Sequence, residues 1–265
     1  MLVKAYIVDH HPVAKDIYLL AFSAPQIALS AKAGQFVHIR CSEGVDPLLR
    51  RPFSISAIDR EAGTISIIYE IRGRGTKILS HYSVGQALDV LGPLGNWFSL
   101  GKLKSESRAI LIGGGIGAPP MAALTQALAE KGLSQVKVIL GAATKDKLCP
   151  EELFMKTGAE VFLATDDGTR GHHGFVTELL PQLISEKPDK FFVFACGPKG
   201  MLKAVGDFCL QRNISCQLSL EEIMACGVGA CQGCACKVSS EDGFDYVRVC
   251  TEGPVFEAGE VVFDD

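Results

Sequence analysis

The densest group of reactive side chains lies near the carboxyl end of the chain. Four of the ten cysteines fall between residues 226 and 236, and another follows at position 250. Cys226, Cys231 and Cys234 form the pattern C-x4-C-x2-C, and Cys250 comes after fifteen intervening residues. This is the spacing of plant-type [2Fe–2S] sites, in which four thiolates hold two irons bridged by sulfide. The pattern predicts such a cluster, with Cys226, Cys231, Cys234 and Cys250 as its ligands, the last from a neighbouring strand at 247–250.

Other interpretations of these cysteines remain open. Cys236 could replace Cys234, because positions 234 and 236 of a strand point to the same face. Cys234 is favoured because it preserves the C-x2-C step and lies in a loop with three glycines, at 227, 229 and 233, which permit positive φ and bring backbone N–H groups near sulfur. Zinc binding would usually require two C-x2-C pairs, and unrelated buried thiols are the remaining alternative.

A glycine-rich turn lies in the middle of the chain, between an apolar strand and a helix. It contains Gly113, Gly114, Gly115 and Gly117, which would let the backbone approach a pyrophosphate at a helix N-terminus. Ala118 takes the last position of the G-x-G-x-x-G/A pattern. A tight structural turn would produce the same pattern.

Two further turns follow predicted strands. They are Thr165–Gly168, which contains Asp166, and Cys196-Gly197-Pro198. Ligands of open parallel sheets bind at the carboxyl ends of strands, so three such turns together predict a dinucleotide site. The sequence has no basic cluster suited to a 2′-phosphate, which favours NAD over NADP.

A third motif, Arg51-Pro52-Phe53-Ser54, begins a β-rich run. A guanidinium can pair with a phosphate through two hydrogen bonds, and a nearby hydroxyl could bind the edge of a flavin ring. Ile68-Tyr69-Glu70 follows, and Gly75 and Thr76 open a short predicted helix whose N-terminus could receive a phosphate. On physical grounds alone, an ordinary strand and turn explains these residues equally well.

The elements that would position these motifs divide the chain into three parts. Residues 1–100 contain six short β-rich runs, which predict a six-stranded antiparallel barrel, with one short helix over 75–82. In residues 101–215, strands at 108–115, 135–143, 159–168 and 190–198 alternate with helices at 119–131, 151–157 and 199–213. This alternation predicts a parallel sheet with helices on both faces. Residues 216–265 are Gly- and Cys-rich and too poor in aliphatic residues to form a core without a prosthetic group.

Composition excludes several classes of protein. The chain has 265 residues, 48% of them hydrophobic, which is enough for two or three packed domains and too much for a disordered chain. The net charge of −4 argues against nucleic acid as a partner. No apolar run is long enough to span a membrane, and the N-terminus lacks the pattern of a signal peptide, so we expect a cytoplasmic protein.

The motifs and their order resemble a known family. The segments RRPFSIS, GPLGNWF, GGGIGAPP, CGPKGM and MACGVGACQGCAC occur in that order and cover essentially the whole chain. The chain therefore resembles the ferredoxin–NADP reductase-like flavoproteins, and within them the electron-transfer subunits of class 1B dihydroorotate dehydrogenases. This resemblance implies an FAD-binding barrel (1–100), an NAD-binding α/β domain (101–215) and a small [2Fe–2S] domain (216–265).

The resemblance also implies roles for individual residues. Arg51 would contact an FAD phosphate, and Ser54 would lie by the flavin ring. Phe53 stands where many broader relatives have Tyr, so it could stack on a ring but offers no hydroxyl. Cys196 would lie near the nicotinamide and, with Ser54, belong to the catalytic site. The other expected cofactor-binding residues are Pro52, Phe53, Ile68, Tyr69, Glu70, Gly75 and Thr76 for FAD, and Gly113, Gly114, Gly115, Gly117, Asp166, Gly197 and Pro198 for NAD.

The implied task is electron transfer. Dihydroorotate would be oxidised on a separate FMN-containing catalytic subunit, in a heterotetramer with two copies of each chain, and electrons would pass through the cluster and FAD to NAD+ in pyrimidine biosynthesis. Reductase subunits of hydrogenases or bifurcating transhydrogenases are also similar, but they typically have Asp at the first cluster position, where this chain has Cys226. A zinc-stabilised nucleotide-binding module is the third hypothesis.

Overall fold

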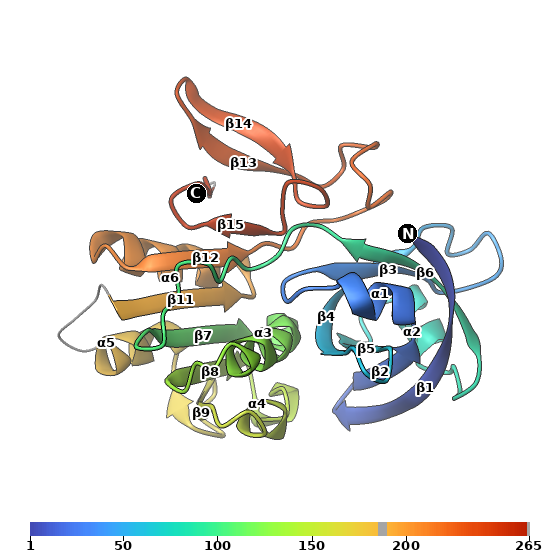
Figure 1. Cartoon of the computed structure of the whole chain (residues 1–265), viewed down its shortest axis with the longest axis horizontal. Coiled ribbons are helices and arrows are strands. Elements are labelled where there is room, and N and C mark those ends of the chain that lie inside the picture. The colour runs from blue at the N-terminus through green and yellow to red at the C-terminus, as the bar shows by residue number, and fades with distance from the viewer. Residues whose placement is uncertain (185–189, 264–265) are drawn as a thin grey trace.

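The first part of the chain closes into an antiparallel barrel (Figure 1). The computed structural model describes residues 1–184 and 190–263. Around the barrel the strand order is β1-β2-β5-β4-β3-β6, which confirms the predicted six-stranded barrel. The bounds are β1 (Leu2–Ala14), β2 (Ile17–Ser23), β3 (Phe36–Arg40), β4 (Arg51–Asp59), β5 (Thr64–Glu70) and β6 (Ala87–Leu94).

Two short helices interrupt the barrel strands. The helix expected near residue 75 is α2 (Arg74–Leu79). The other, α1 (Pro25–Ser30), was not expected, because six residues are too few to show helical periodicity. Inside the barrel, alternate residues form the core, so that Val37 and Ile39 of β3 point inward.

The second part forms a seven-stranded sheet in the order β10-β9-β8-β7-β11-β12-β15. All neighbouring strands are parallel except β12 and β15, which are antiparallel. The parallel α/β prediction is therefore confirmed, with one antiparallel edge strand that was not expected. The bounds are β7 (Arg108–Gly114), β8 (Val136–Ala142), β9 (Glu160–Thr165), β10 (His172–His173), β11 (Phe191–Cys196), β12 (Ser215–Ser219) and β15 (Val255–Glu257).

Helices cover both faces of this sheet because its central strands are apolar on both sides. On β7, Ala109 and Leu111 pack into one core, while Ile110 and Ile112 pack into the other. The first core includes α3 (Ala118–Glu130) and α4 (Glu152–Met155), and the second includes α5 (Leu180–Leu183) and α6 (Lys199–Gln211). Short 3-10 turns within the described residues complete the connections, namely η1 (Gly115–Gly117), η2 (Lys145–Lys147) and η3 (Val176–Leu179).

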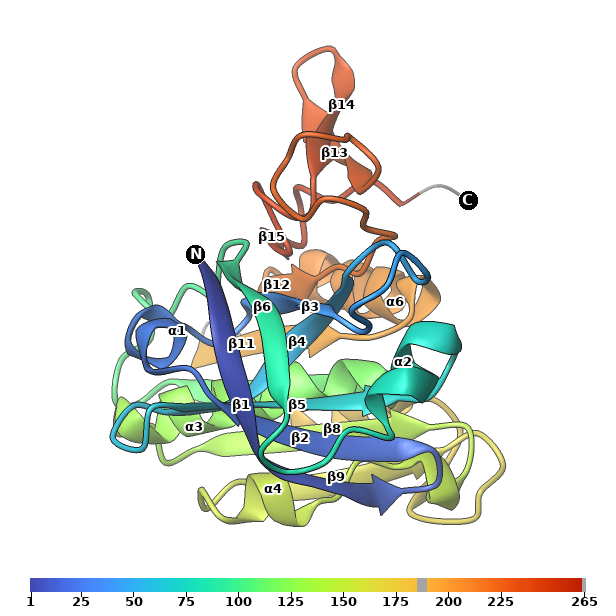
Figure 2. The ribbon, with the colours of Figure 1, turned by 90° about the vertical axis from the view of Figure 1, so that its right-hand side faces the viewer.

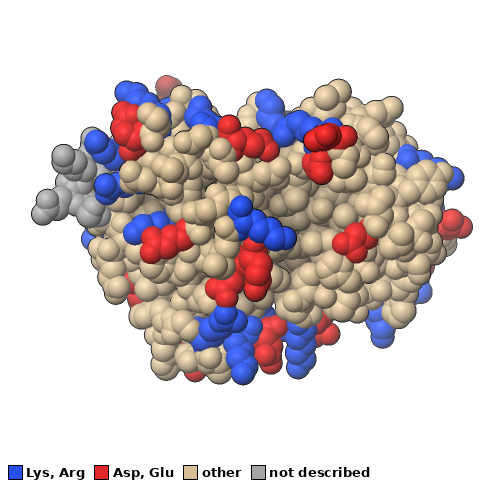
Figure 3. Space-filling model, turned by 60° about the horizontal axis from the view of Figure 1, so that its bottom comes forward, with Lys and Arg blue, Asp and Glu red and all other residues tan. Residues whose placement is uncertain are grey.

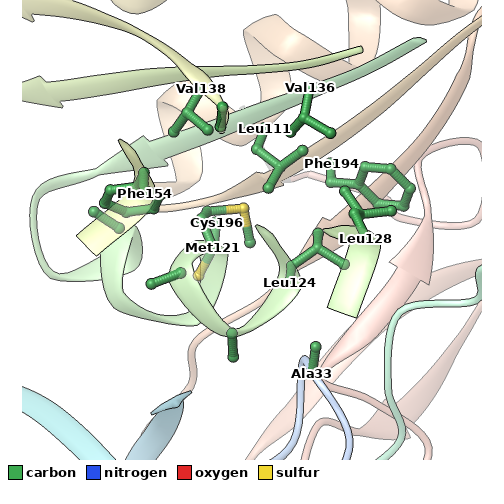
Figure 4. Packing of buried hydrophobic residues seen from close by; sticks show 14 of the residues in the cluster. Ala33, Leu111, Met121, Leu124, Leu128, Val136, Val138, Phe154, Phe194 and Cys196 are labelled. Atoms are coloured by element: carbon green, nitrogen blue, oxygen red, sulfur yellow. The ribbon is translucent and has the colours of Figure 1, made fainter. Parts of the chain in front are cut away.

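The barrel and the sheet share a core. Ala33 from the barrel side and Leu124 and Leu128 of α3 belong to one apolar cluster, which also contains Phe194 and Cys196 of β11 (Figure 4). Burial of this shared surface fixes the barrel against the carboxyl end of the sheet. The strand ends and the barrel strand β4 therefore lie beside each other.

The last part of the chain carries a two-stranded hairpin, β13 (Ala235–Ser240) and β14 (Gly243–Arg248), which projects from the rest of the molecule (Figures 1 and 2). The expected domain limit between residues 215 and 216 falls within β12, and β15 also joins the central sheet. We keep the limits 1–100, 101–215 and 216–265 as a proposed division by cofactor.

One local expectation needs correction. Cys250 was expected on a strand, but β14 ends at Arg248 and Cys250 lies in the turn that follows. The chain turns there because the amides of Thr251, Glu252 and Gly253 all donate to the carbonyl of Arg248. The amide of Val249 donates to the carbonyl of Cys234, which draws the turn toward the cysteine loop.

Surface charge and helix length bear on two of the excluded classes. On the face shown in Figure 3, acidic and basic side chains are interspersed, without a basic stripe of the kind that binds nucleic acid. Within the described ranges, no helix is long and apolar enough to cross a membrane.

Candidate functional site

A cavity of about 220 Å³ opens where the barrel, the sheet and the cysteine-rich segment meet. We call it the junction cavity. Its walls come from all three parts of the chain, so it could hold a ring system in contact with each of them. The lining residues are Phe36, Pro52, Phe53, Ser54, Ile68, Tyr69, Glu70, Arg72, Thr76, Ile116, Ser219, Leu220, Glu221, Glu222, Met224 and Pro254.

Most of the predicted flavin residues line this cavity. Pro52, Phe53 and Ser54 of β4 lie on one wall, and the three residues Ile68–Glu70 of β5 lie beside them with Thr76 of α2. Arg51 and Gly75 lie just outside it. A Cβ added to Gly75 would be 3.2 Å from Arg51 Nε, so the two residues are in contact. The structure thus brings the two predicted phosphate-binding residues together at the rim.

Tyr69 provides a rigid part of the wall. It is almost fully buried. Its ring meets the Phe53 ring edge-on, with centroids 5.5 Å apart, and stacks on the Tyr18 ring, with centroids 5.9 Å apart. Its hydroxyl lies 2.9 Å from His10 Nε2. Burial raises the pKa of Tyr69, and the neighbouring Tyr18 adds to this increase, so its hydroxyl stays protonated at neutral pH.

Two charged groups were not found from the sequence: Glu221, which lines this cavity, and Lys147, which pairs with the lining residue Glu70. The Glu221 side chain is exposed within the cavity, yet surrounding protein atoms desolvate it and raise its pKa, with Arg72 opposing the increase. For Glu70, partial burial opposes ionisation, but hydrogen bonds from Lys147 and Arg72 outweigh it and lower the pKa of Glu70. The only sequence signal for Glu221 is its position shortly before the cysteine loop. Lys147 gives no such signal, because it lies far from Glu70 in the sequence.

A second cavity, of about 500 Å³, opens at the carboxyl ends of β7, β8 and β9, and we call it the sheet-edge cavity. Gly114, Gly115, Asp166 and Pro198 line it, as expected for a dinucleotide site. The amide of Asp166 donates to the carbonyl of Ala142 and leaves its carboxylate exposed. The remaining lining residues are Gly141, Ala142, Ala143, Ala164, Gly174, Phe175, Val176, Thr177, Gly200, Met201 and Ala204.

The other predicted nucleotide-binding glycines do not line this cavity but permit close packing behind it. A Cβ on Gly113 would lie 2.5 Å from the Ala118 Cα, and one on Gly117 would lie 2.4 Å from the Cys196 carbonyl oxygen. Gly197 has φ +157° and approaches the Cα of Gly114. These glycines let the turn, α3 and β11 come together, which places Gly114 and Gly115 at the cavity.

Cys196 lies behind the cavity walls. It is fully buried at the end of β11, between Gly113 of β7 and Ser219 of β12, and lines neither cavity. Burial raises the pKa of its thiol, the charge of Glu221 adds to the increase, and a hydrogen bond with Ser219 opposes it. The thiol therefore stays protonated, and its neighbour Ser219 lines the junction cavity. Its catalytic role remains a prediction.

In the cysteine loop, backbone amides are directed at sulfur. The amides of Val228 and Cys231 each lie 3.4 Å from Cys226 Sγ, and the amide of Gly229 lies 3.2 Å from Cys250 Sγ. Positive φ angles at Gly227 and Gly229, of +71° and +80°, turn these amides inward. Such N–H groups stabilise thiolates and are what an anionic iron–sulfur cluster requires from its surroundings.

The sulfur atoms have different environments. Hydrogen bonds from the amides of Val228 and Cys231 lower the pKa of Cys226 to about 6. Burial and the adjacent Cys234 thiol raise the pKa of Cys250 to about 11, so Cys234 and Cys250 are neighbours. Cys231 is exposed and Cys226 partly exposed, whereas Cys234 and Cys250 are buried. Of the four predicted ligands, Cys234 and Cys250 therefore face the protein interior, whereas Cys226 and Cys231 lie toward solvent.

Cys236 lies one position into β13, opposite Val247 of β14. It is buried, and burial raises its pKa to about 11. Cys234, in contrast, is close to Cys250 and lies in the loop itself, which fits the predicted choice. Among the residues that the structure describes, no three His, Cys, Asp or Glu side chains form a group suited to a single metal ion.

Comparison with known families agrees with this division of the chain. Residues 4–98 match the oxidoreductase FAD-binding domain, and residues 111–207 match the oxidoreductase NAD-binding domain. Residues 221–262 match the iron–sulfur cluster binding domain of dihydroorotate dehydrogenase B. The cofactors predicted from the sequence, FAD, NAD and an iron–sulfur cluster, are those of the three matched domains.

Relatives match over almost the whole chain. A protein from Geobacillus sp. (strain WCH70), named dihydroorotate dehydrogenase B (NAD(+)), electron transfer subunit, is 44% identical over 97% of this chain and 96% of its own length. The chain belongs to this family of electron transfer subunits. Another dihydroorotate dehydrogenase B electron transfer subunit, from Bacillus mycoides (strain KBAB4), is 41% identical over the same shares of both chains.

Solved structures show the same fold. One chain of the NADH-dependent reduced ferredoxin-NADP oxidoreductase, whose structure concerns flavin-based electron bifurcation, is 30% identical to this chain. The two superpose with a TM-score of 0.83 over 97% of this chain and 89% of that one. The ferredoxin reductase of carbazole 1,9a-dioxygenase is 21% identical, with a TM-score of 0.69 over 81% of this chain and 66% of that one, and shares the fold. The dihydroorotate dehydrogenase B electron transfer subunits thus share the barrel and sheet of a wider group of reductases.

Proposed function

We propose that this chain is the electron-transfer subunit of an NAD-dependent dihydroorotate dehydrogenase, acting in pyrimidine biosynthesis. The observation that carries the proposal is the junction cavity, where Ser54 and Tyr69 of the barrel face Glu222 and Met224, which directly precede the cysteine loop. A flavin held there would lie next to the cluster-binding segment. When bound, the cluster and FAD supply the one- and two-electron chemistry that connects dihydroorotate oxidation to NAD+ reduction.

The chain's own residues would bind and orient FAD. Arg51 and Thr76, at the rim, would hold its phosphates, since a guanidinium and a hydroxyl beside a helix N-terminus bind phosphate oxygens. Phe53 and Tyr69 would pack against the ring, and Ser54 would hydrogen-bond its edge. Glu221, which is desolvated by the surrounding protein, would place a carboxyl group near the ring.

The nucleotide would bind along the strand ends. Gly114 and Gly115 would admit the pyrophosphate of NAD, with the partial positive charge of the α3 N-terminus behind them. Asp166 and Pro198 would flank it. Because Ser219 and Ile116 line the junction cavity close to this turn, the nicotinamide would approach the flavin from the sheet side.

The cluster would be held by four thiolates, those of Cys226, Cys231, Cys234 and Cys250. The three amide-to-sulfur contacts support this set, because they would stabilise thiolates and the negative cluster. Zinc is disfavoured because its sites usually have two C-x2-C pairs and this chain has one.

A partner subunit would dock at the exposed side of the cluster loop. Cys231 is exposed there, and the apolar side chains of Ile223 and Val228 are 87% and 52% exposed, which is typical of surfaces that another protein covers. We propose an FMN-containing catalytic subunit at this surface, two copies of each chain in the complex, and a cytoplasmic location, which suits ten free cysteines.

The experiment is to purify the chain anaerobically, alone and with its catalytic subunit. Alone it should contain FAD, iron and sulfide, reduce an artificial dye with NADH, and not oxidise dihydroorotate. With the partner it should reduce NAD+ with dihydroorotate. Orotate production by the isolated chain, or the absence of iron and sulfide, would overturn the proposal.

A subunit of a bifurcating transhydrogenase is the second candidate, because a chain from that structure aligns over 97% of this one. Cys226 at the first cluster position and the 44% identity to the Geobacillus subunit favour the dihydroorotate complex. Mass spectrometry of the co-purifying partner separates the two: a dihydroorotate-oxidising flavoprotein supports the first and a ferredoxin-linked subunit the second.

A further inference from the structure

The outer face of β3 lies between the flavin wall and the cysteine loop. Val37 and Ile39 point into the barrel core, so Phe36 and His38 point outward. Phe36 lines the junction cavity and also packs in one apolar cluster with Cys234 and Cys250. This short strand therefore contacts both candidate cofactor sites.

His38 is the unusual residue on this face. Its side chain is fully buried, at 0% exposure, and among the described residues neither ring nitrogen makes a hydrogen bond of good geometry, although the backbone of Cys226 lies within reach of the ring. Burying an imidazole without a partner is costly, so native proteins rarely retain one without a reason. No role in forming the barrel explains it, because the residues on either side already supply the core.

The ring lies directly against the cysteine loop. A Cβ added to Gly227 would be 2.6 Å from His38 Nδ1, and 3.1 Å from the ring carbon between the two nitrogens. Gly227 has φ +71° and follows the predicted ligand Cys226. Only a glycine at this position lets the loop approach the ring so closely, and the ring nitrogen nearest the loop is Nδ1.

His38 also lies beside β4, the strand that lines the junction cavity. In the β3–β4 ladder His38 pairs with Pro52, and Phe36 pairs with Ser54, so these two outward residues of β3 stand opposite the motif that lines the junction cavity. A neutral imidazole has one N–H to donate.

We propose that His38 is a positioning residue that donates a hydrogen bond from the barrel into the Cys226–Gly227 segment of the loaded cluster loop and so raises the reduction potential of the cluster. This inference rests on the proposed function. Reduction adds one negative charge to the cluster, and an N–H dipole fixed in a dry environment favours the more negative state. Because the donor is anchored to β3, the cluster loop is also held at a constant position relative to the flavin wall.

The test compares three variants of the full chain, loaded with FAD and cluster. His38→Leu removes the donor but fills the space, and His38→Asn places an amide N–H close to the position of Nδ1. His81→Leu is the control, because it removes an exposed histidine of the same domain. The cluster potential is measured by redox titration followed by electron paramagnetic resonance, and the flavin potential by absorbance in the same samples.

We expect His38→Leu to lower the equilibrium constant for cluster reduction about tenfold, which is a fall of about 59 mV in a one-electron midpoint potential. The flavin potential should not change, His38→Asn should recover most of the loss, and His81→Leu should match the wild type. An unchanged cluster potential in fully loaded His38→Leu would overturn the inference.

If His38→Leu does not bind iron, the His38→Asn variant decides whether the N–H donor or the shape of the ring is required. Full iron and sulfide content with a near-native potential in His38→Asn would support a donor, whereas loss of the cluster there too would overturn it, because the ring shape rather than the N–H would then be required. Failure of the proposed function is visible separately, as wild-type protein without iron, sulfide or NADH-dependent dye reduction.

Discussion

Lys147 Nζ lies 2.7 Å from Glu70 Oε1, so an ion pair joins the 3-10 turn after β8 to the barrel strand that lines the junction cavity. The same lysine lies 3.6 Å from Asp16, and Arg72 holds the second oxygen of Glu70 at 2.5 Å. Glu70 is mostly buried, at 17% side-chain exposure. The pair therefore links the nucleotide-binding sheet to the flavin wall at a partly buried point.

Replacing Lys147 with Met should weaken this link. We expect a loss of about 0.5–1 kcal/mol in the free energy of unfolding, because the pair is only partly buried and Arg72 still neutralises Glu70. Urea unfolding of FAD-loaded protein measures the difference. Lys145→Met, at an exposed lysine of the same turn, serves as control and should change the free energy of unfolding by less.

The effect of Lys147→Met should depend on pH in one direction. The pKa of Glu70 is lowered in the folded protein, so its contribution is complete above the ordinary carboxyl pKa of about 4.3 and is lost as pH falls through the lowered value. The difference between wild type and Lys147→Met should therefore be constant near neutral pH and shrink below about pH 4. A difference that grows on acidification would contradict this assignment.

The sequence predicted the elements whose patterns are local. The six barrel strands, the strands β7, β8, β9 and β11, and the helices α3 and α6 each have a periodicity or a flanking turn residue that can be recognised within a short window. The cysteine spacing and the Arg51–Ser54 motif are local in the same sense. This is why the fold class and the set of cofactors could be predicted without a structure.

Residues that act through long-range contacts could not be predicted. Lys147 reaches Glu70 across 77 positions, and His38 meets Gly227 from a different domain. Glu221 acquires its raised pKa only because the barrel and the cysteine segment close around it. β15 has three residues and joins β12 after the hairpin, so no periodicity could have marked it.

The choice between Cys234 and Cys236 can be tested directly. Cys234→Ser should remove the cluster, because the Cys234 thiol adjoins Cys250 in the loop, whereas Cys236→Ser on β13 should retain it. Iron, acid-labile sulfide and visible absorption of anaerobically purified protein are the measurements. Cys231→Ser is the matched positive control for loss. Full loading in Cys234→Ser with loss in Cys236→Ser would reverse the ligand set.

Removing the cluster should expose one unusually reactive thiol. Because the pKa of Cys226 is about 6 and that of Cys250 about 11, Cys226 is mostly thiolate at pH 7 and Cys250 is not. Allowing for the lower nucleophilicity of the more acidic thiol, alkylation of Cys226 should be about a hundredfold faster.

Peptide mapping by mass spectrometry after brief treatment with iodoacetamide measures this ratio. The rate at Cys226 should fall as pH drops through about 6. Cys149, buried with a pKa raised to about 12, should remain unmodified in folded protein. Protein that retains its cluster should show no alkylation at Cys226, and a Cys226 rate that rises only above pH 8 would exclude the role of the loop amides.

Gly117 should be intolerant of a side chain for a purely steric reason. Its φ is −78°, which any residue can adopt, but an added Cβ would lie 2.4 Å from the carbonyl oxygen of Cys196 and 2.6 Å from the Cα of Gly197. These are backbone atoms of the neighbouring strand end and cannot move aside individually. Gly117→Ala should therefore lower the free energy of unfolding by about 1–3 kcal/mol and raise the KM for NADH, because the displaced turn carries Gly114 and Gly115.

Two other glycines separate the possible causes of such a loss. Gly115→Ala meets no atom within 4 Å but must adopt φ +55°, so it should cost about 1 kcal/mol through backbone strain alone. Gly101→Ala has neither problem and should stay within about 0.5 kcal/mol of the wild type. Urea unfolding and NADH titration of all three variants give the comparison. If Gly117→Ala were as mild as Gly101→Ala, α3 could not be packed as closely on the end of β11 as the geometry requires.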